Sequence, residues 1–205
     1  MAWWRTVYGL GWFPMDEGDA GIQLFRGRER ALIPLDHRLH VPRSLQRHLN
    51  RDPASGGFEL GLDRAFERVL AGCRDRPRTW ISDELAAVYR QLHAGGLAHS
   101  VEVWQGDTLA AGMLSIAIGA CWIGESMFHG RPQAGNVLLV SLARALAAGG
   151  FLLFDVQISN PHLERFGCFS VADAQFSTWL ARACGQTAIL RLQGEALTSE
   201  GWMAG

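Results

Sequence analysis

Apolar and polar positions follow two different periods along the 205-residue chain, and the change between them falls after Gly95-Gly96. Ahead of this point, apolar residues recur at helical spacing. The pattern predicts helices over Arg43–Leu49, Asp63–Cys73 and Ser82–His93. Ser82 can cap the third of these helices, and the two glycines can end it.

Beyond Gly96 the pattern becomes that of short strands separated by helices. Two apolar runs flank a Gln-Gly-Asp turn at residues 105–107, which is typical of a β-hairpin. A later run has no charge before Asp155, as expected of a strand that is buried on both faces. The predicted strands are Ser100–Trp104, Leu109–Ile118, Cys121–Ser126, Phe151–Val156 and Ala188–Leu192, with helices at Val137–Ala148 and Asp173–Cys184.

The order of these elements over residues 99–192 is ββ-β-α-β-α-β, which predicts an α+β domain with a mixed sheet. The acetyltransferase-like (GNAT-type) fold has the same order. Residues 1–60 are rich in Gly, Pro and Arg and contain only short apolar pieces such as Ala31–Leu35. We therefore expect a small N-terminal subdomain (residues 1–60), an acetyltransferase-like domain (61–194) and a loose tail (195–205).

Composition narrows the class of protein only moderately. A hydrophobic content of 48% is enough for a substantial core. The net charge of -1 shows no overall preference for nucleic acid, although a local basic patch can still bind RNA. The four cysteines form no CxxC pair, so neither a zinc site nor a disulfide framework is indicated. Without a signal peptide or a membrane-spanning stretch, a cytoplasmic protein is expected.

Three stretches, taken in order and spacing, resemble a known family. They are Thr79-Trp80-Ile81 leading to His99-Ser100-Val101-Glu102-Val103-Trp104, then Gly124-Glu125-Ser126-Met127-Phe128, then Phe154-Asp155-Val156-Gln157. Weaker agreement extends to Tyr8, Gly11, Phe13, Arg30-Ala31 and Tyr89. Over about residues 8–180 the chain resembles the leucyl/phenylalanyl-tRNA–protein transferases.

This resemblance implies an aminoacyltransferase. Members of the family move Leu or Phe, and in some cases Met, from aminoacyl-tRNA to proteins that begin with Arg or Lys, which marks those proteins for degradation by the N-degron route. The partners implied are a charged tRNA and an acceptor protein, with neither DNA nor a membrane. Because an aminoacyl ester is already activated, we expect the reaction to need no cofactor and no metal.

The resemblance also implies where the chemistry lies. Gln157 would hold the attacking α-amine, and Asp155 would orient it, since residues two apart on a strand point to the same face. Glu125, together with Asp155, would bind the cationic acceptor. Taken without the family, Asp155 and Gln157 read better as hydrogen-bonded residues of a strand end, while Glu125 reads equally well as a turn carboxylate.

Further residues would bind the donor. The aminoacyl and adenosine pocket is expected to involve Met15, Trp80, Met113, Trp122 and Phe154, although apolar strand residues are more often plain core. Trp80, beside a polar helix start, is the best candidate to stack on the terminal adenine. The tRNA backbone would be bound by Arg43, Arg47, Arg74, Arg76 and Arg78, for which a solvated surface run is the alternative.

The chain also departs locally from the family pattern. Ala134-Gly135-Asn136 stands where a Ser-Lys pair is usual, and Val171-Ala172-Asp173 stands where Ile-Pro-Arg is usual. Both changes remove a basic group, so tRNA binding should depend on the remaining arginines. Two other functions stay open at this point. One is an acyl-CoA-dependent N-acyltransferase of the same fold, against which the unmatched pyrophosphate loop at residues 130–136 argues. The other is a non-catalytic module that binds RNA or protein N-termini.

Overall fold

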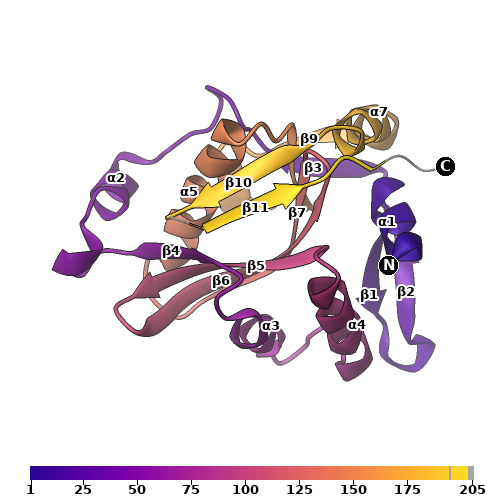
Figure 1. Cartoon of the computed structure of the whole chain (residues 1–205), viewed down its shortest axis with the longest axis horizontal. Helices are drawn as coiled ribbons and strands as arrows, with labels where there is room; N and C mark the ends of the chain where they lie inside the picture. The colour runs from indigo at the N-terminus through magenta and orange to yellow at the C-terminus, as the bar shows by residue number, and fades with distance from the viewer. Residues whose placement is uncertain (194, 203–205) are drawn as a thin grey trace.

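The computed structural model of the chain describes residues 1–193 and 195–202, and a seven-stranded mixed sheet lies at its centre (Figure 1). The order of strands across the sheet is β4-β5-β6-β7-β8-β3-β9. Neighbouring strands are antiparallel except for β7 and β8, which are parallel. The strands are β3 (Glu29–Ile33), β4 (Glu59–Leu62), β5 (Ala98–Gln105), β6 (Thr108–Ile118), β7 (Cys121–His129), β8 (Leu153–Gln157) and β9 (Phe169–Ala172).

Helices pack against the sheet from both sides. In Figure 1, α3 and α4 lie below β5 and β6, and α5 lies above them. The hydroxyl of Ser82 accepts a hydrogen bond from the Leu85 N–H at 3.1 Å, so it caps α4 as its sequence position predicts. The helices are α1 (Ala2–Gly9), α2 (Arg43–Leu49), α3 (Phe66–Arg74), α4 (Asp83–Ala94), α5 (Ala134–Ala148), α6 (Pro161–Glu164) and α7 (Asp173–Cys184), with 3-10 turns at Gly18–Ala20 and Pro53–Ser55.

The predicted α+β class with a mixed sheet is confirmed. The central hairpin β5–β6, the strands β7 and β8 and the helices α2, α4, α5 and α7 all form where the hydrophobic pattern places them. Among residues 1–193 and 195–202, no helix has the length and apolar character that a membrane span requires.

Part of the expected topology is wrong. The strand at Ala188–Leu192 (β10) does not join the central sheet but pairs with β11 (Glu195–Ser199) in a separate hairpin. The strand beside β8 is β3, which comes from the first 60 residues and lies between β8 and β9. The apolar run Ala31–Ile33 of β3 is buried against the core, and this burial offsets the polar residues at the start of the strand.

The N-terminal residues also form a small hairpin of β1 (Phe13–Asp16) and β2 (Ile22–Phe25). The tail predicted to be loose contains β11, so that prediction fails for residues 195–199, while residues 203–205 lie outside the described part of the chain. The division of the chain at residue 60 stays a prediction.

Candidate active site

The two parallel strands of the sheet separate at one end. Residues Cys121–Ile123 of β7 pair with residues Leu153–Asp155 of β8, and the pairing ends there. A cavity of about 290 Å³ lies where the pairing has stopped, and we call it the splay cavity. Its lining comes from both strands, from α5 and from the segment before α4, and includes Arg76, Trp80, Met113, Gly124, Glu125, Ser126, Met127, Leu139, Val156, Asn160, His162 and Leu163.

Each of the two strands carries a bulge beside this cavity. In β7, Ser126 pairs with Leu114 and Gly124 with Ser115, which leaves Glu125 as the extra residue. In β8, Gln157 pairs with Ala31 and Asp155 with Leu32 of β3, which leaves Val156 as the extra residue. Bulges re-aim side chains and are common beside active sites. Both extra residues line the splay cavity.

Asp155 is fully buried and is compensated by a buried arginine. The Arg30 Nε donates to both Asp155 oxygens, at 3.0 and 2.9 Å, and the two side chains form an ion pair at 2.8 Å. The Arg30 Nη1 donates to the Gly11 carbonyl at 2.8 Å. The guanidinium carbon lies 4.9 Å from the Phe13 ring centre and 4.8 Å from that of Phe176. Arg30 is therefore held by Asp155, the Gly11 carbonyl and two aromatic rings.

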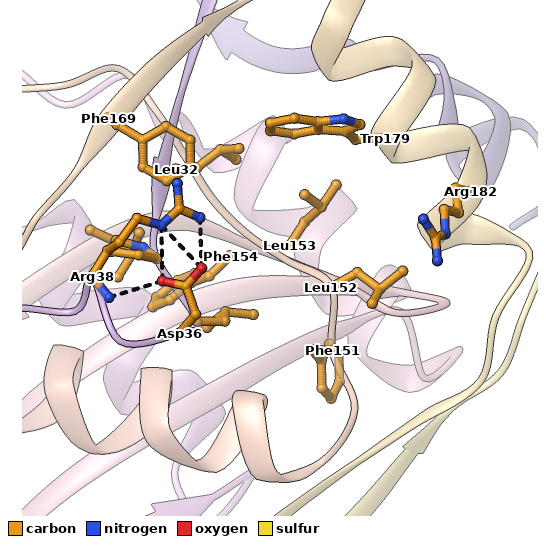
Figure 2. A pocket seen from close by; sticks show the side chains of 13 residues that line it. Leu32, Asp36, Arg38, Phe151, Leu152, Leu153, Phe154, Phe169, Trp179 and Arg182 are labelled. Carbon is orange, nitrogen blue, oxygen red and sulfur yellow. Dashed lines mark hydrogen bonds and ion pairs between the residues drawn. The ribbon is translucent and has the colours of Figure 1, made fainter.

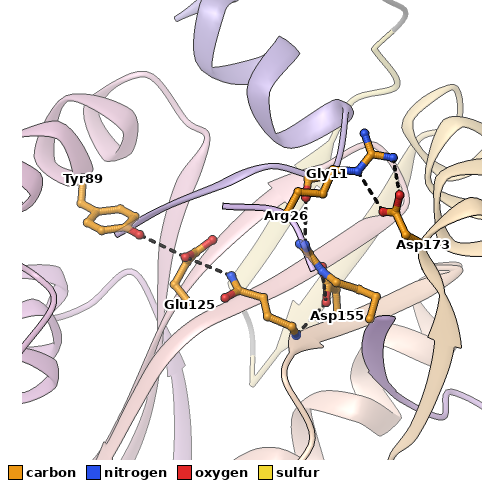
Figure 3. Close-up of polar contacts among 8 residues, drawn as sticks. Gly11, Arg26, Tyr89, Glu125, Asp155 and Asp173 are labelled. Atoms are coloured by element: carbon orange, nitrogen blue, oxygen red, sulfur yellow. Dashed lines mark hydrogen bonds and ion pairs between the residues drawn. The ribbon is translucent and has the colours of Figure 1, made fainter. Parts of the chain in front are cut away.

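Gln157 connects this pair to Glu125. Figure 3 shows Glu125 with Tyr89 on one side and Asp155 on the other. The backbone N–H of Gln157 donates to Asp155 Oδ1 at 2.8 Å, and its side-chain amide donates to Glu125 Oε2 at 3.2 Å. Gln157 has a φ of 63°, a left-handed conformation that is unfavourable for a side chain other than glycine. The hydrogen bond to Asp155 helps to hold the strand end in this conformation.

Glu125 is buried, and no cationic side chain of residues 1–193 and 195–202 forms an ion pair with its carboxylate. Its Oε2 accepts from the Tyr89 hydroxyl at 3.1 Å and from the Gln157 amide. Its Oε1 is buried and has no hydrogen-bond partner among the described residues. Burial raises the pKa of Glu125 to about 7, although the hydrogen bonds from Tyr89 and Gln157 work in the opposite direction. A carboxyl with this pKa can gain or lose a proton at neutral pH.

Two more pockets lie nearby. One, also of about 290 Å³, borders Gln157 beside the β1–β2 hairpin and is lined by Phe13, Met15, Phe25 and Arg30 among others; we call it the hairpin pocket. The other, of about 380 Å³, lies at the opposite end of β8, between Leu153, Phe169 and Trp179 (Figure 2). Gln157 thus borders the hairpin pocket, and its side chain is connected to the splay cavity through the hydrogen bond to Glu125.

Comparison with known proteins connects this geometry to an enzyme family. A family model described as leucyl/phenylalanyl-tRNA protein transferase matches residues 32–181. Curated relatives of that name are 52% identical in Synechococcus sp. (strain JA-3-3Ab), over 80% of this chain and 84% of the relative, and 47% identical in Thermosynechococcus vestitus, over 86% of this chain and 87% of the relative.

The chain belongs to this family. The predicted family and the predicted enzyme class, an aminoacyltransferase, are therefore confirmed. Among solved structures, the C-terminal DUF2156 domain of an Agrobacterium fabrum protein is similar at a TM-score of 0.45 and 14% identity, covering 88% of this chain and 61% of that chain.

The fold of this transferase brings Glu125, Asp155 and Gln157 together as the sequence predicts. Asp155 and Gln157 were expected to point to the same face of the strand. The bulge at Val156 breaks the alternation of side chains and corrects this expectation. Asp155 contacts the backbone of Gln157, while the Gln157 side chain reaches Glu125. Since both Asp155 oxygens already have donors and the side chain is fully buried, Asp155 offers no free carboxylate to an acceptor.

The five predicted pocket residues lie in three different places. Trp80 and Met113 line the splay cavity, and Met15 lines the hairpin pocket. Trp122 is fully buried and packs against the His99 ring at 6.1 Å, so it is a core residue. Phe154 is also fully buried and borders the pocket of Figure 2. Neither Trp122 nor Phe154 lines the splay cavity, because both lie on the stretch where β7 and β8 are still paired.

The predicted tRNA-binding arginines also differ from one another. Arg76 lies at the splay cavity and donates to the Met127 carbonyl at 2.5 Å. Arg74 is half-buried and is used inside the fold, by the Ile81 carbonyl and by Asp83. Arg78 is exposed, and so are Arg43 and Arg47 on α2.

Sequence reasoning missed Arg30 and Tyr89 as parts of the site. Both fell in step with the family pattern, but neither received a role. The contact of Arg30 with Asp155 could not be predicted, because β3 was not expected to join the sheet beside β8. Asp173, one of the departures from the family pattern, pairs with Arg26 through two hydrogen bonds of 2.9 and 2.8 Å, so it serves the fold.

Asp63, His93 and His99 form a cluster with the composition of a metal site, but their Nδ1 nitrogens and carboxylate are engaged in hydrogen bonds within the fold. The Nδ1 of His99 lies 2.7 Å from Asp63 Oδ2, and the Nδ1 of His93 lies 2.9 Å from the Ala98 carbonyl. His93 must donate to that carbonyl, so its Nδ1 carries the proton and has no lone pair for a metal. We read the cluster as a hydrogen-bonded link between β5 and the helices beside it.

Proposed function

We propose that this chain transfers Leu or Phe, and with a suitable tRNA Met, from aminoacyl-tRNA to the N-terminus of proteins that begin with Arg or Lys. The product would be marked for degradation by the N-degron route. The observation that carries the proposal is the hydrogen bond from Gln157 to Glu125, which lies at the edge of an apolar cavity. A transferase needs an amine-holding group beside a donor pocket, and this arrangement supplies one.

The splay cavity fits the donor. Met113, Met127 and Leu139 give it apolar walls suited to a Leu or Phe side chain. Trp80 stands at the same cavity and is half-buried, so one ring face is available for the terminal adenine. Base stacking of this kind contributes roughly 1–3 kcal/mol. We propose that the acetyltransferase-like fold assists here, because a parallel strand pair that separates, as β7 and β8 do, opens a pocket between its ends.

The polar groups fit the reaction. The attacking α-amine must be held in line with the ester carbonyl and must lose a proton. We assign the holding to the amide oxygen of Gln157 and the orientation of Gln157 to Asp155. Glu125, with one buried oxygen unpartnered, would bind the positive charge of the acceptor. No covalent intermediate on the protein is needed, because the ester is already activated.

The experiment is a transfer assay with radiolabelled leucyl-tRNA and a peptide that begins with Arg. Label should appear in the peptide, should not depend on added coenzyme A, and should be strongly reduced when the peptide begins with Glu. Acetyl-CoA in place of leucyl-tRNA is the matched donor control. Acetylation of the peptide without leucyl transfer would favour the acyl-CoA alternative, and tRNA binding without any transfer would favour a binding module.

A further inference from the structure

Arg30 stands out because it is a buried arginine with only 3% of its surface exposed. It comes from β3 and reaches Asp155 of β8, the Gly11 carbonyl, and the rings of Phe13 and Phe176. Gly11, Phe13 and Arg30 all precede the stretch matched by the family model, which begins at residue 32. We call residues 1–31 the N-terminal segment.

A fully buried carboxylate is stable in a protein only when its charge is compensated. Among the described residues, Arg30 is the side chain that forms an ion pair with Asp155. Because the Arg30 Nε donates to both carboxylate oxygens and Nη2 lies 2.8 Å from Oδ2, the pair fixes the orientation of Asp155 as well as its charge. That orientation points Oδ1 at the backbone N–H of Gln157.

The contacts therefore form one continuous line through the site. It runs from the Gly11 carbonyl through Arg30 and Asp155 to the backbone of Gln157, and on through the Gln157 amide to Glu125 (Figure 3). Gln157 has a left-handed backbone that needs outside support. Loss of Arg30 would remove the fixed end of this line and leave Gln157 free to change its backbone conformation.

We infer that Arg30 is a positioning residue of the transfer reaction, and that the N-terminal segment acts through it to complete the active site. This inference rests on the proposed role of Gln157. Arg30 itself does not border the splay cavity, so it acts on the rate through Asp155 and Gln157 and not by touching the donor.

The structure provides a matched control for this inference. Arg26 also pairs with an aspartate, donating from Nε and Nη2 to the two oxygens of Asp173, and links the β2–β3 loop to α7. It borders the hairpin pocket, but among the described residues no hydrogen bond or ion pair leads from it to Gln157. The substitution Arg30→Met keeps a long, unbranched side chain between Phe13 and Phe176 and removes the charge. Arg26→Met makes the same chemical change outside the line.

With leucyl-tRNA and an Arg-starting peptide, Arg30→Met should lower kcat on the order of 100-fold, as positioning losses do, with the affinity for leucyl-tRNA unchanged. Arg26→Met should keep a normal kcat. In Arg30→Ala, millimolar guanidinium should restore part of the rate through the hairpin pocket, which borders Arg30, whereas urea of the same shape and no charge should not. A folded Arg30→Met with a normal kcat would overturn the inference.

If Arg30→Met does not fold, Arg30→Lys provides the same test, because it keeps the charge but loses the two-pronged fork. It should fold and still have a lowered kcat, and a normal kcat would again overturn the inference. The side-chain amide resonance of Gln157 in NMR spectra gives a readout that is independent of activity. It should move in the Arg30 variants and not in Arg26→Met. Absence of leucyl transfer by the wild type would refute the proposed function, whereas an unmoved resonance would refute only the role of Arg30.

Discussion

The ends of β7 and β8 present two buried carboxylates in contrasting surroundings. Asp155, on β8, is paired with the guanidinium of Arg30. Glu125, on β7, receives hydrogen bonds from two neutral groups in the described part of the chain, the Tyr89 hydroxyl and the Gln157 amide. Burial is almost the same for the two, yet Asp155 faces a cation and Glu125 faces neutral donors. The comparison teaches that the partner, more than the depth, decides whether a buried acid serves the framework or can exchange a proton.

The surroundings of Glu125 reinforce this difference. Tyr89 and Tyr8 are fully buried beside it, and burial, followed by the negative charge of Glu125, raises the pKa of both hydroxyls well above 10.0. Both tyrosines therefore keep their protons at neutral pH. Glu125 thus lies in a region of fixed neutral donors, where its own proton is the one that can move.

The largest effect should come from removing the charge on the β8 side. Asp155→Asn leaves Arg30 buried without its counter-ion, and breaking a buried pair in this way costs about 3–5 kcal/mol of unfolding free energy. Glu125→Gln should not lower stability at pH 7, since an amide can meet the same neutral partners. Urea denaturation of both variants, with Arg26→Met as an exposed-pair control, measures the difference. Equal losses of unfolding free energy in Asp155→Asn and Glu125→Gln would contradict the proposed difference between the two carboxylates.

A second prediction concerns pH. The pKa of Glu125 is raised from 4.5 to about 7 in the folded protein, so the folded state binds the proton more tightly than the unfolded state does. The corresponding stability is fully present below about pH 4.5 and is lost as the pH rises through 7, by about 3 kcal/mol in all. Glu125→Gln should lack this loss.

Because histidines titrate in the same range, the quantity to measure is the difference in unfolding free energy between wild type and Glu125→Gln from pH 4.5 to 8. That difference should grow in favour of the variant as the pH rises. A constant difference would mean that folding does not raise the pKa of Glu125.

The third prediction tests the residue that joins the two carboxylates. Gln157→Ala should lower kcat on the order of 100-fold, because it removes the group that holds the amine in line, and it should leave tRNA affinity near normal. Steady-state kinetics with varied peptide at saturating leucyl-tRNA would show this, with Glu125→Gln as the comparison. Glu125→Gln should chiefly raise the peptide concentration needed. A normal maximal rate in Gln157→Ala would place the chemistry elsewhere.

The sequence was sufficient for much of this architecture. Helical spacing located α2, α4 and α7 closely, and the alternation around the turn at residues 105–107 located the β5–β6 hairpin. These elements have long, regular patterns, which are the most informative kind. Glu125, Asp155 and Gln157 were found through their motifs, and the structure places them in contact.

What the sequence could not show depends on long-range pairing and on irregular backbone. β3 is short, begins with two charged residues, and joins the sheet between strands from the far end of the chain. The ion pair of Arg30 with Asp155 therefore spans 125 positions. The bulges at Glu125 and Val156 shift the side chains by one residue, which a strict alternation does not anticipate. Trp122 and Phe154 were assigned to the donor pocket by resemblance to the family, and both precede the bulges, on the stretch where β7 and β8 are still paired.

The smallest effect should come from the arginines outside the cavity, which separate donor binding from the chemistry of the two carboxylates. Arg78 is exposed and has no side-chain hydrogen bond or ion pair among the described residues, whereas Arg74 is occupied by Ile81 and Asp83. Arg78→Gln should weaken leucyl-tRNA binding only a few-fold and reduce the salt dependence by about one phosphate contact. Arg74→Gln should lower thermal stability and leave that dependence unchanged. Binding titrations across a salt series, with Asp155→Asn included, give the test. Should Arg78 prove neutral while Arg43→Gln on α2 changes the slope, the tRNA backbone runs over α2 and not past Trp80.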